Sequence, residues 1–502
     1  MHQMEETLTD LQNDFIELST LASSGVERLK EHIQSLEKSS NNYSSVSYTY
    51  LRHTSEELLA AYMQILATAN EELGLSQSWS ISDADRLIRI KKQQADFFRV
   101  LQSSLGSILS AGNWQSPSFE HTSLPQAGVE TGTIAASMND YKRDMHAEEK
   151  RYGEKFIEQY IDHDVRTTPR AFPTSSGMSA MTTVINHLFT TVGPKDVVMV
   201  GNSCYFQNKL ILEKIFSGKI VYFDEDDTDT LITLARKHQP PILFLDSLSV
   251  TESLTMPDLP NILPELGRIL SARSAIVLDN TALTTAYQPL HDLPRNAAMR
   301  LFVIESLIKY HQFGSDRVNG GIIWTPATTA TDLFVSRMHL GTILSDTAAL
   351  SLPTPNRKIF DARLQRLGRN ARMLALYLEE LVQTENGPLS RVIHPAVRPH
   401  PAHVRAKDFP FQGSFVILSF KPHYQKISYY DAFLNRVMAV AREKEVDILG
   451  GTSFGFSTTR IYVNARFSMG LTKPFVRISV GTETKKEIDA LAEVFKIALS
   501  TI

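Results

Sequence analysis

The sequence predicts an α/β protein with a mostly parallel sheet, a helical region before it and a smaller α+β domain after it. Three observations lead to this prediction. Apolar residues recur at helical spacing over residues 1–112, short apolar strands alternate with helical segments from about 170 to 325, and a long helix and two strands follow residue 350. The chain has 502 residues, enough for two or three domains. The predicted division is a helical extension (1–112), a linker or arm (113–139), a large domain (140–345) and a small domain (346–502).

The helical extension contains three series of apolar residues spaced three and four apart, which predicts three amphipathic helices. The series run from Leu8 to Leu36, from Leu51 to Ala69 and from Leu87 to Ile108. Ser82 and Asp83 are the predicted N-cap of the third helix. Apolar stripes of this size favour packing on the rest of the chain and its subunit interfaces. A separate bundle that recognises a partner or a substrate carrier is the alternative.

Composition excludes several classes of protein. Hydrophobic residues make up 42%, charged residues 21%, and the net charge is -4, which is ordinary for a soluble globular protein. The basic stretch 86–99 is interrupted or flanked by Asp83, Asp85 and Asp96, so a solvated helix face is favoured over a nucleic-acid patch. The single cysteine, Cys204, excludes an internal disulfide and a cysteine-based zinc cluster, and a reducing cytoplasm fits best. No secretory signal, membrane span or metal site is predicted.

The middle of the chain contains the strands that define the fold. The candidates are residues 196–200, 219–223, 241–246, 275–279, 300–306 and 320–325, with two more at 414–420 and 475–480. Most are short, β-branched and apolar, as expected of parallel strands covered on both faces. In such a sheet, polar residues just past the carboxyl ends of strands face the ligand crevice.

Three groups of residues in this region carry chemistry of their own. Ser176, Gly177 and Met178 precede a helical segment, where small residues let backbone N–H groups and a hydroxyl bind a phosphate. Asp279 ends a predicted strand, and a carboxylate there can keep a pyridinium nitrogen protonated. Lys309 follows another strand, where its amine can form a Schiff base. Each also has an ordinary interpretation, namely a helix cap, an Asx turn and an exposed lysine.

In this order, the motifs resemble those of the Cys/Met-metabolism family of pyridoxal-phosphate (PLP) enzymes, which includes cystathionine gamma-synthases, cystathionine lyases, methionine gamma-lyases and O-acylhomoserine sulfhydrylases. The resemblance runs from about residue 140 to the C-terminus and leaves the first 130 residues outside it. It implies PLP as cofactor and a large domain of the aspartate-aminotransferase-like type (fold type I).

The resemblance implies a role for each matching residue. Lys309 forms the Schiff base, Asp279 holds the pyridine nitrogen, and Tyr205 stacks on the ring and assists proton transfer. The implied phosphate contacts are Ser176, Gly177, Met178 and Ser306, with Tyr141 and Arg143 reaching the neighbouring subunit's cofactor. Arg477 corresponds to the arginine that grips the substrate carboxylate, and Ser453 lies in LGGTSFG, which resembles a substrate-side loop.

The sequence also departs from the family. The family's Asn-Pro-Thr segment is missing. Tyr205 is followed by Phe206 and Gln207 instead of two glycines, which would narrow the space beside the ring. The family's Glu-Ser-x-x-Asn segment aligns with Asp246 or with Glu252, and neither alignment supplies the asparagine. Because of these departures, the sequence does not identify the substrate.

The resemblance implies gamma-replacement or gamma-elimination on a homoserine-, cystathionine- or methionine-like amino acid, through a vinylglycine-type intermediate. Beta-elimination on a cystathionine-like substrate is the close alternative, and Tyr205 disfavours an aminotransferase. A hypothesis of another class is a binding or regulatory protein with a degenerate site. The retained Lys309, Asp279, Tyr205 and Arg477 argue against it.

The expected partners are a small amino-acid substrate and further copies of the chain, in a homodimer or homotetramer with shared active sites. Nucleic acid and membrane are not expected partners, and a cytoplasmic location is expected. The leaving group, the nucleophile, the pathway and the role of residues 1–130 are not fixed by the sequence.

Overall fold

The computed structural model describes residues 2–38, 40, 43–111, 147–163, 168–330, 333–382, 387–464 and 474–501. They form two compact units. Unit 1 comprises Met1–Ile161, Thr168–His187 and Ser306–Ile359, and unit 2 comprises Asp162–Thr167, Leu188–Glu305 and Phe360–Ile502. The boundaries expected at 112, 139 and 345 mark changes in sequence pattern and remain a prediction about folding domains. Tyr141 and Arg143 lie outside the described residues.

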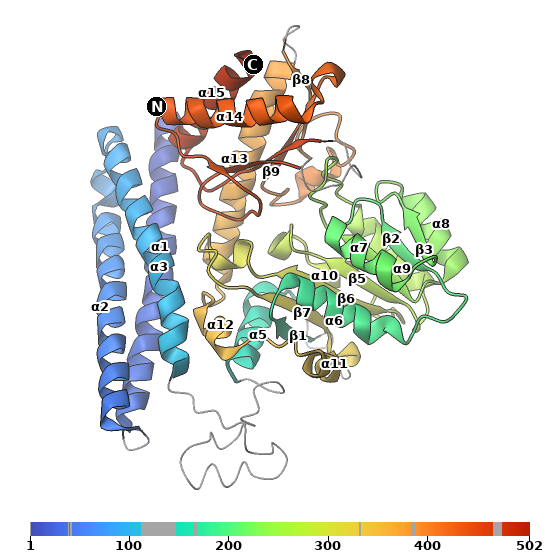
Figure 1. Ribbon diagram of the computed structural model, residues 1–502, viewed down its shortest axis with the longest axis horizontal. Helices are drawn as coiled ribbons and strands as arrows, with labels where there is room; N and C mark the ends of the chain where they lie inside the picture. The colour runs from blue at the N-terminus through green and yellow to red at the C-terminus, as the bar shows by residue number, and fades with distance from the viewer. Residues whose placement is uncertain are drawn as a thin grey trace. The chain divides into compact units, whose positions relative to one another are not determined.

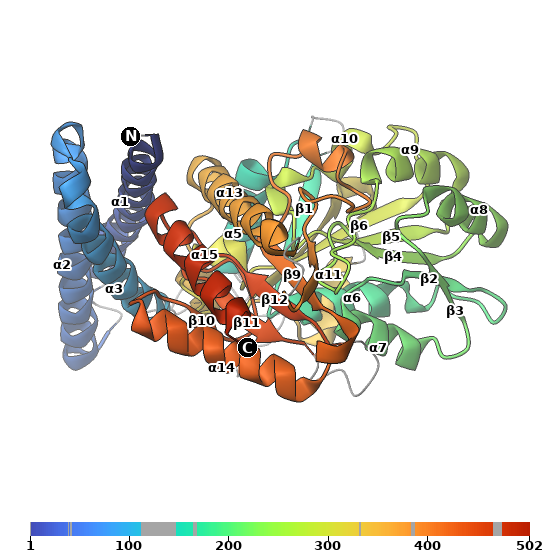
Figure 2. The same ribbon diagram turned by 90° about the horizontal axis from the view of Figure 1, so that it is seen from above.

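Unit 1 begins with the three predicted helices, α1 (His2–Lys38), α2 (Ser45–Leu75) and α3 (Ala84–Ala111), which lie side by side (Figures 1 and 2). Their apolar stripes face one another, and Phe15 and Tyr62 are fully buried. A Cβ atom at Gly25 would lie 2.4 Å from the Tyr62 ring, so this glycine allows α1 and α2 to approach closely.

The start of α3 agrees with one of the two predicted N-cap residues, because α3 begins at Ala84, directly after Asp83. The short 3₁₀ helix η3 (Ile81–Asp83) leads into α3, so the other candidate, Ser82, lies inside η3. Ser80 caps η3 in a capping box with Asp83. The Ser80 N–H donates to Asp83 Oδ2 at 2.9 Å, and the Ser80 hydroxyl donates to the same oxygen at 2.6 Å.

The rest of unit 1 contains α5 (Ala147–Tyr160), β1 (Pro169–Thr174), the first part of α6 (Gly177–Phe189), η5 (Tyr310–Gln312), β7 (Gly321–Pro326), η6 (Ala327–Thr329), α11 (Leu333–Leu340) and α12 (Asp346–Ser351). β1 pairs antiparallel with β7. The buried Arg337 guanidinium ties three of these elements together. Its Nη1 donates to Glu149 Oε2 at 2.9 Å and to the Pro173 carbonyl at 2.8 Å.

The helical extension packs on this body through α3 and α12. A Cβ atom at Gly106 would lie 1.8 Å from Ser351 Oγ and 2.5 Å from the Thr347 carbonyl oxygen. Gln102 Nε2 donates to the Ser351 carbonyl at 2.6 Å, and Arg317 Nε donates to the Arg99 carbonyl at 3.1 Å. These contacts confirm that the helices pack on the rest of unit 1, and the expected place at subunit interfaces stays a prediction.

Unit 2 contains five parallel strands in the order β6-β5-β4-β2-β3. They are β2 (Val198–Gly201), β3 (Ile220–Phe223), β4 (Ile242–Asp246), β5 (Ala275–Asp279) and β6 (Arg300–Ser306), and all five were predicted. The helices α7 (Phe206–Ile215), α8 (Thr228–His238), α9 (Leu259–Ile269) and α10 (Pro289–Asp292) and the 3₁₀ helix η4 (Thr284–Ala286) lie between the strands in the chain. All residues of β4 are buried, which confirms strands covered on both faces.

The C-terminal part of unit 2 is the expected α+β arrangement. A second sheet has the order β10-β11-β12-β9-β8, and α14 and α15 lie side by side next to it (Figure 2). The elements are α13 (Arg357–Val382), β8 (Leu389–Ile393), β9 (Phe415–Phe420), α14 (Ile427–Glu443), β10 (Leu449–Gly450), β11 (Arg460–Val463), β12 (Val476–Ser479) and α15 (Lys485–Ser500). Among the residues described, none of the helices is both long and apolar enough to cross a membrane.

Candidate active site

The predicted phosphate loop lies in unit 1, where β1 ends and α6 begins. Ser176 caps α6, because its hydroxyl accepts a hydrogen bond from the Ser179 N–H at 3.0 Å. A Cβ atom at Gly177 would lie 2.8 Å from Ser306 Cβ, so only a glycine permits this close approach. The structure thus brings Ser176, Gly177 and Ser306 together, with Met178 half-buried in the first turn of α6. Free backbone N–H groups and two hydroxyls at a helix start are a suitable site for a phosphate.

Lys309 lies three residues beyond Ser306, directly before η5. It is half-buried between the fully buried Leu307 and Tyr310, which anchor its backbone on both sides. The buried Gln312 side chain fixes the loop that follows. Its Nε2 donates to the Leu307 carbonyl at 3.2 Å and to the Val318 carbonyl at 2.6 Å. Gln312 was not singled out from the sequence, since a glutamine in a loop has no distinctive signal.

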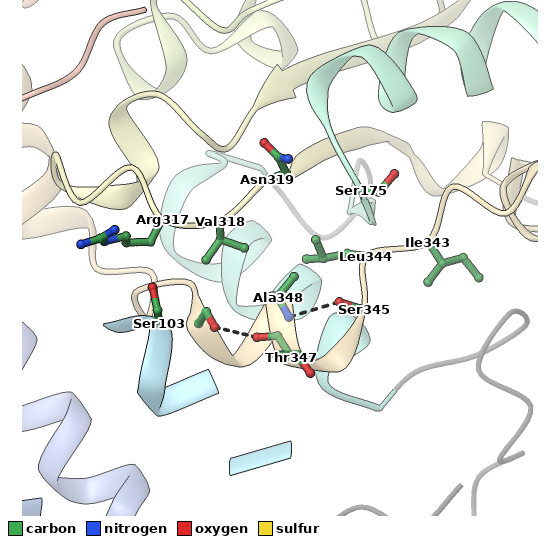
Figure 3. A pocket seen from close by; sticks show the side chains of 11 residues that line it. Ser103, Ser175, Arg317, Val318, Asn319, Ile343, Leu344, Ser345, Thr347 and Ala348 are labelled. Carbon is green, nitrogen blue, oxygen red and sulfur yellow. Dashed lines mark hydrogen bonds between the residues drawn. The ribbon is translucent and has the colours of Figure 1, made fainter. Parts of the chain in front are cut away.

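A cavity of about 430 Å³ borders these loops in unit 1 (Figure 3). Its wall includes Ser175, Arg317 and Asn319 from the body of the unit, Ser103 from α3, and Thr347 from α12. Ser175 directly precedes the phosphate loop. The helical extension therefore supplies part of the wall of a cavity that lies beside the predicted cofactor-phosphate site.

In unit 2, Asp279 ends β5 as predicted. Its carboxylate accepts hydrogen bonds from the Thr281 N–H at 3.0 Å and from Asn208 Nδ2 at 3.3 Å. Burial raises the pKa of Asp279, while the hydrogen bond from Thr281 acts in the opposite direction. A half-buried carboxylate with two hydrogen-bond donors has the chemistry needed to hold a pyridinium N–H.

Tyr205 directly precedes α7, and its side chain is 40% exposed. Its N–H donates to Asp246 Oδ2 at 2.9 Å, and its hydroxyl donates to Gln207 Oε1 at 2.9 Å. Burial raises the pKa of the Tyr205 phenol, Arg477 acts to lower it, and Asp279 acts to raise it. Hydrogen bonds place the start of α7 beside Asp279, because Asn208, three residues after Tyr205, donates to the Asp279 carboxylate at 3.3 Å.

Arg477 lies on β12, half-buried, with its guanidinium carbon 5.7 Å from the centroid of the Tyr462 ring on β11. Such a cation–π contact helps to orient the guanidinium. Ser453 is half-buried in the segment between β10 and β11 and has a left-handed backbone, with φ of 71°. The position of Arg477 suits a substrate carboxylate.

Comparison with known proteins decides the family. A family profile described as Cys/Met metabolism PLP-dependent enzyme matches residues 110–499. The chain belongs to this family. It is therefore a PLP-dependent enzyme of the carbon-sulfur lyase and transferase group, and its large domain has fold type I.

Two solved structures share this fold. Cystathionine gamma-synthase from Xanthomonas oryzae pv. oryzae has a TM-score of 0.58 at 20% identity, covering 78% of this chain and 93% of that one. Cystathionine gamma-lyase from Lactobacillus plantarum has a TM-score of 0.59 at 18% identity, covering 77% and 93%.

A curated relative, "Bifunctional enzyme flvA" of Aspergillus flavus, is 25% identical over 398 residues, which is 78% of this chain. The chain spans 46% of the length of that relative.

The residues present fit PLP. The close approach of Gly177 to Ser306 forms a cradle that a Cβ atom would fill, and the half-buried Asp279 carboxylate suits a ring nitrogen. Of the two residues that the sequence offers for the family's Glu-Ser-x-x-Asn segment, Asp246 ends β4 in register with Asp279 at the end of β5. Asp246, like Gln312, was not selected as a site residue, although it carries the same signal as Asp279: a carboxylate that ends a buried strand.

Proposed function

We propose that this chain catalyses gamma-replacement or gamma-elimination on a homoserine-, cystathionine- or methionine-like amino acid. The observation that carries the proposal is the pair of hydrogen bonds that hold Tyr205 and the start of α7 against the carboxylates that end β4 and β5, one of which is Asp279. An arginine for the substrate carboxylate and a phenol in its neighbourhood are the groups needed to hold an amino acid and to move protons along its side chain.

Each protein group has a separate task in this proposal. PLP, when bound, supplies an electron sink for the negative charge that develops at the substrate alpha carbon. The Asp279 carboxylate keeps negative charge at the ring nitrogen, and the helix start at Gly177 with the Ser176 and Ser306 hydroxyls binds the phosphate. The Lys309 amine holds the cofactor and then moves the alpha proton.

Substrate orientation and leaving-group chemistry fall to unit 2. Arg477 binds the substrate carboxylate through a charge-assisted fork, which fixes the amino acid relative to the catalytic amine. The raised pKa of Tyr205 keeps the phenol protonated at neutral pH, so that it can donate a proton to a departing gamma substituent. The hydrogen bond to Gln207 Oε1 also favours the protonated phenol, because an amide oxygen can only accept.

The assembly is part of the proposal. We propose a homodimer or homotetramer in which Tyr141 and Arg143 reach the phosphate of a neighbouring subunit. We also propose a cytoplasmic location, which suits the buried Cys204 thiol that forms no disulfide. Light scattering of the purified protein measures the first point. A monomer that turns over substrate at a full rate would contradict it.

The reaction is tested with the purified, PLP-loaded protein and a panel of O-acylhomoserines, cystathionine and methionine. A four-carbon keto acid with ammonia identifies gamma-elimination, and a new thioether or other adduct identifies gamma-replacement. Pyruvate from cystathionine would identify beta-elimination and overturn the proposal. Lys309→Ala is expected to abolish turnover, whereas Lys214→Ala, an exposed lysine in the last turn of α7, is the matched control.

A further inference from the structure

Two carboxyl groups tie the start of α7 to two neighbouring strands of unit 2. Asp246, the last residue of β4, accepts from the Tyr205 N–H at 2.9 Å. Asp279, the last residue of β5, accepts from Asn208 Nδ2 at 3.3 Å. The helix start is therefore held at two points three residues apart, and the first of them is the backbone of the proposed catalytic tyrosine.

The Asp246 side chain is buried, unlike a carboxylate that caps a helix at the protein surface. It is 6% exposed and stands in register with Asp279, so the two side chains leave the same face of the sheet. Its Oδ2 receives the Tyr205 N–H, while its Oδ1 has no hydrogen-bond partner among the described residues. A carboxylate that is fully ionised would leave that buried oxygen charged and unpaired, which is costly.

The groups around Asp246 also oppose its ionisation. Asp279 faces it from β5 and Glu225 from the segment after β3, and both are carboxyl groups that raise its pKa, whereas the hydrogen bonds from the Tyr205 N–H and the Cys204 thiol act in the opposite direction. Burial raises the pKa of Asp246 well above its usual range, and the charge of Asp279 raises it further. Asp279 has two hydrogen-bond donors that stabilise its ionised form. Two adjacent carboxyls, of which Asp246 is buried and Asp279 half-buried, divide in this way: the half-buried one is ionised and the buried one is neutral.

We propose that the Asp246 carboxyl is a positioning group, which fixes the main chain of Tyr205 and thereby the direction of its phenol. The inference rests on the proposed place of Tyr205 beside PLP. Asp246 acts as a neutral acid. Its carbonyl oxygen accepts the Tyr205 N–H, and the negative charge of the pair stays on Asp279, where the ring nitrogen requires it.

The neutral form makes a sharp experiment possible, because asparagine has nearly the same shape, carries no charge and keeps the accepting oxygen. Hydrogen exchange of the full-length protein is measured on peptides that span residues 203–208. Asp246→Asn should exchange within about twofold of the wild type, whereas Asp246→Ala should exchange roughly tenfold faster because the acceptor is lost. Asp246→Val replaces the alanine variant if that variant does not fold. Asp229→Asn, an exposed residue in the first turn of α8, is the control.

A second readout reports on the ring itself. Visible circular dichroism of bound PLP depends on the asymmetry around the ring, so the Asp246→Asn band should match the wild type. The Asp246→Ala band should fall to the level of Tyr205→Ala. Fast exchange in Asp246→Asn, or wild-type exchange in Asp246→Ala or Asp246→Val, overturns the positioning role. Absence of any PLP band from the wild type refutes the proposed function instead, and the exchange measurement still tests the contact.

Discussion

The contact between α3 and α12 is tested by substituting the glycine that permits it. In an exposed helix, Gly→Ala stabilises by about 0.5 to 1 kcal/mol, because alanine loses less backbone entropy. At Gly106 the added Cβ would lie 1.8 Å from Ser351 Oγ and 2.5 Å from the Thr347 carbonyl oxygen. The serine side chain can rotate, but the carbonyl belongs to the backbone of α12, so the helices must separate.

Overpacking of this kind costs about 1 to 3 kcal/mol, and a backbone clash belongs in the upper half of that range. After the gain in helix propensity is subtracted, Gly106→Ala should lower the free energy of unfolding by about 1 to 2.5 kcal/mol. Gly74→Ala is the matched control, since a Cβ atom there would meet nothing within 4 Å. It should leave stability unchanged or raise it by up to about 1 kcal/mol.

The assay is urea unfolding of both variants and the wild type, followed by far-ultraviolet circular dichroism. Opposite signs for the two glycines are the expected result. If Gly106→Ala is as stable as the wild type or more stable, then α3 does not lie against α12. The extension would then have a role other than packing, such as recognition of a partner or a substrate carrier.

Three further predictions concern the site. Gly177→Ala should raise the dissociation constant of PLP roughly tenfold, because the new Cβ would lie 2.8 Å from Ser306 Cβ. Gly450→Ala, which adds a Cβ in open space, should leave that constant unchanged. Equilibrium dialysis measures both variants, and equal affinities for PLP would rule out the cradle. Arg477→Ala should raise KM strongly and leave the spectrum of bound PLP intact, since it removes a contact with substrate alone; loss of PLP binding would show that the arginine is misassigned. Burial raises the pKa of Glu225 to about 7. A carboxyl with a raised pKa in the folded state loses stability as it ionises, so the free energy of unfolding of the wild type should fall relative to that of Glu225→Gln by about 2 to 4 kcal/mol as pH rises from about 4.5 through 7. A difference in unfolding free energy between the two proteins that does not change with pH would contradict this.

The sequence predicts the strands of unit 2 well because burial on both faces leaves a strong signal. PILFLD and AIVLD are apolar runs that end in a carboxylate, and both are strands to the residue at that end. β1 was missed because Pro169 and Pro173 interrupt the pattern, and the alternating burial that marks a strand is absent from it. Proline is tolerated where a strand does not need every N–H for pairing.

The candidate site was predictable in part for a similar reason. Asp279 is the last residue of β5 and Lys309 lies three residues past the end of β6, so sequence position alone places them at the carboxyl edge. The role proposed for Asp246 depends on its register with Asp279 and on the turn that brings the Tyr205 N–H to it. Neither the register nor the turn is encoded in a local pattern. Gln312 is the same kind of case, because its four hydrogen bonds close a loop whose shape is known only from the fold.

The central claim is that PLP is bound covalently by Lys309, and chemical trapping measures this most directly. The purified protein is incubated with PLP, reduced with borohydride, digested, and examined by mass spectrometry for a pyridoxyl group on lysine. The account predicts a single major site at Lys309, with loss of that label in Lys309→Ala and retention in Lys214→Ala. A pyridoxyl group at another lysine, or an unlabelled protein after saturation with PLP, would contradict it.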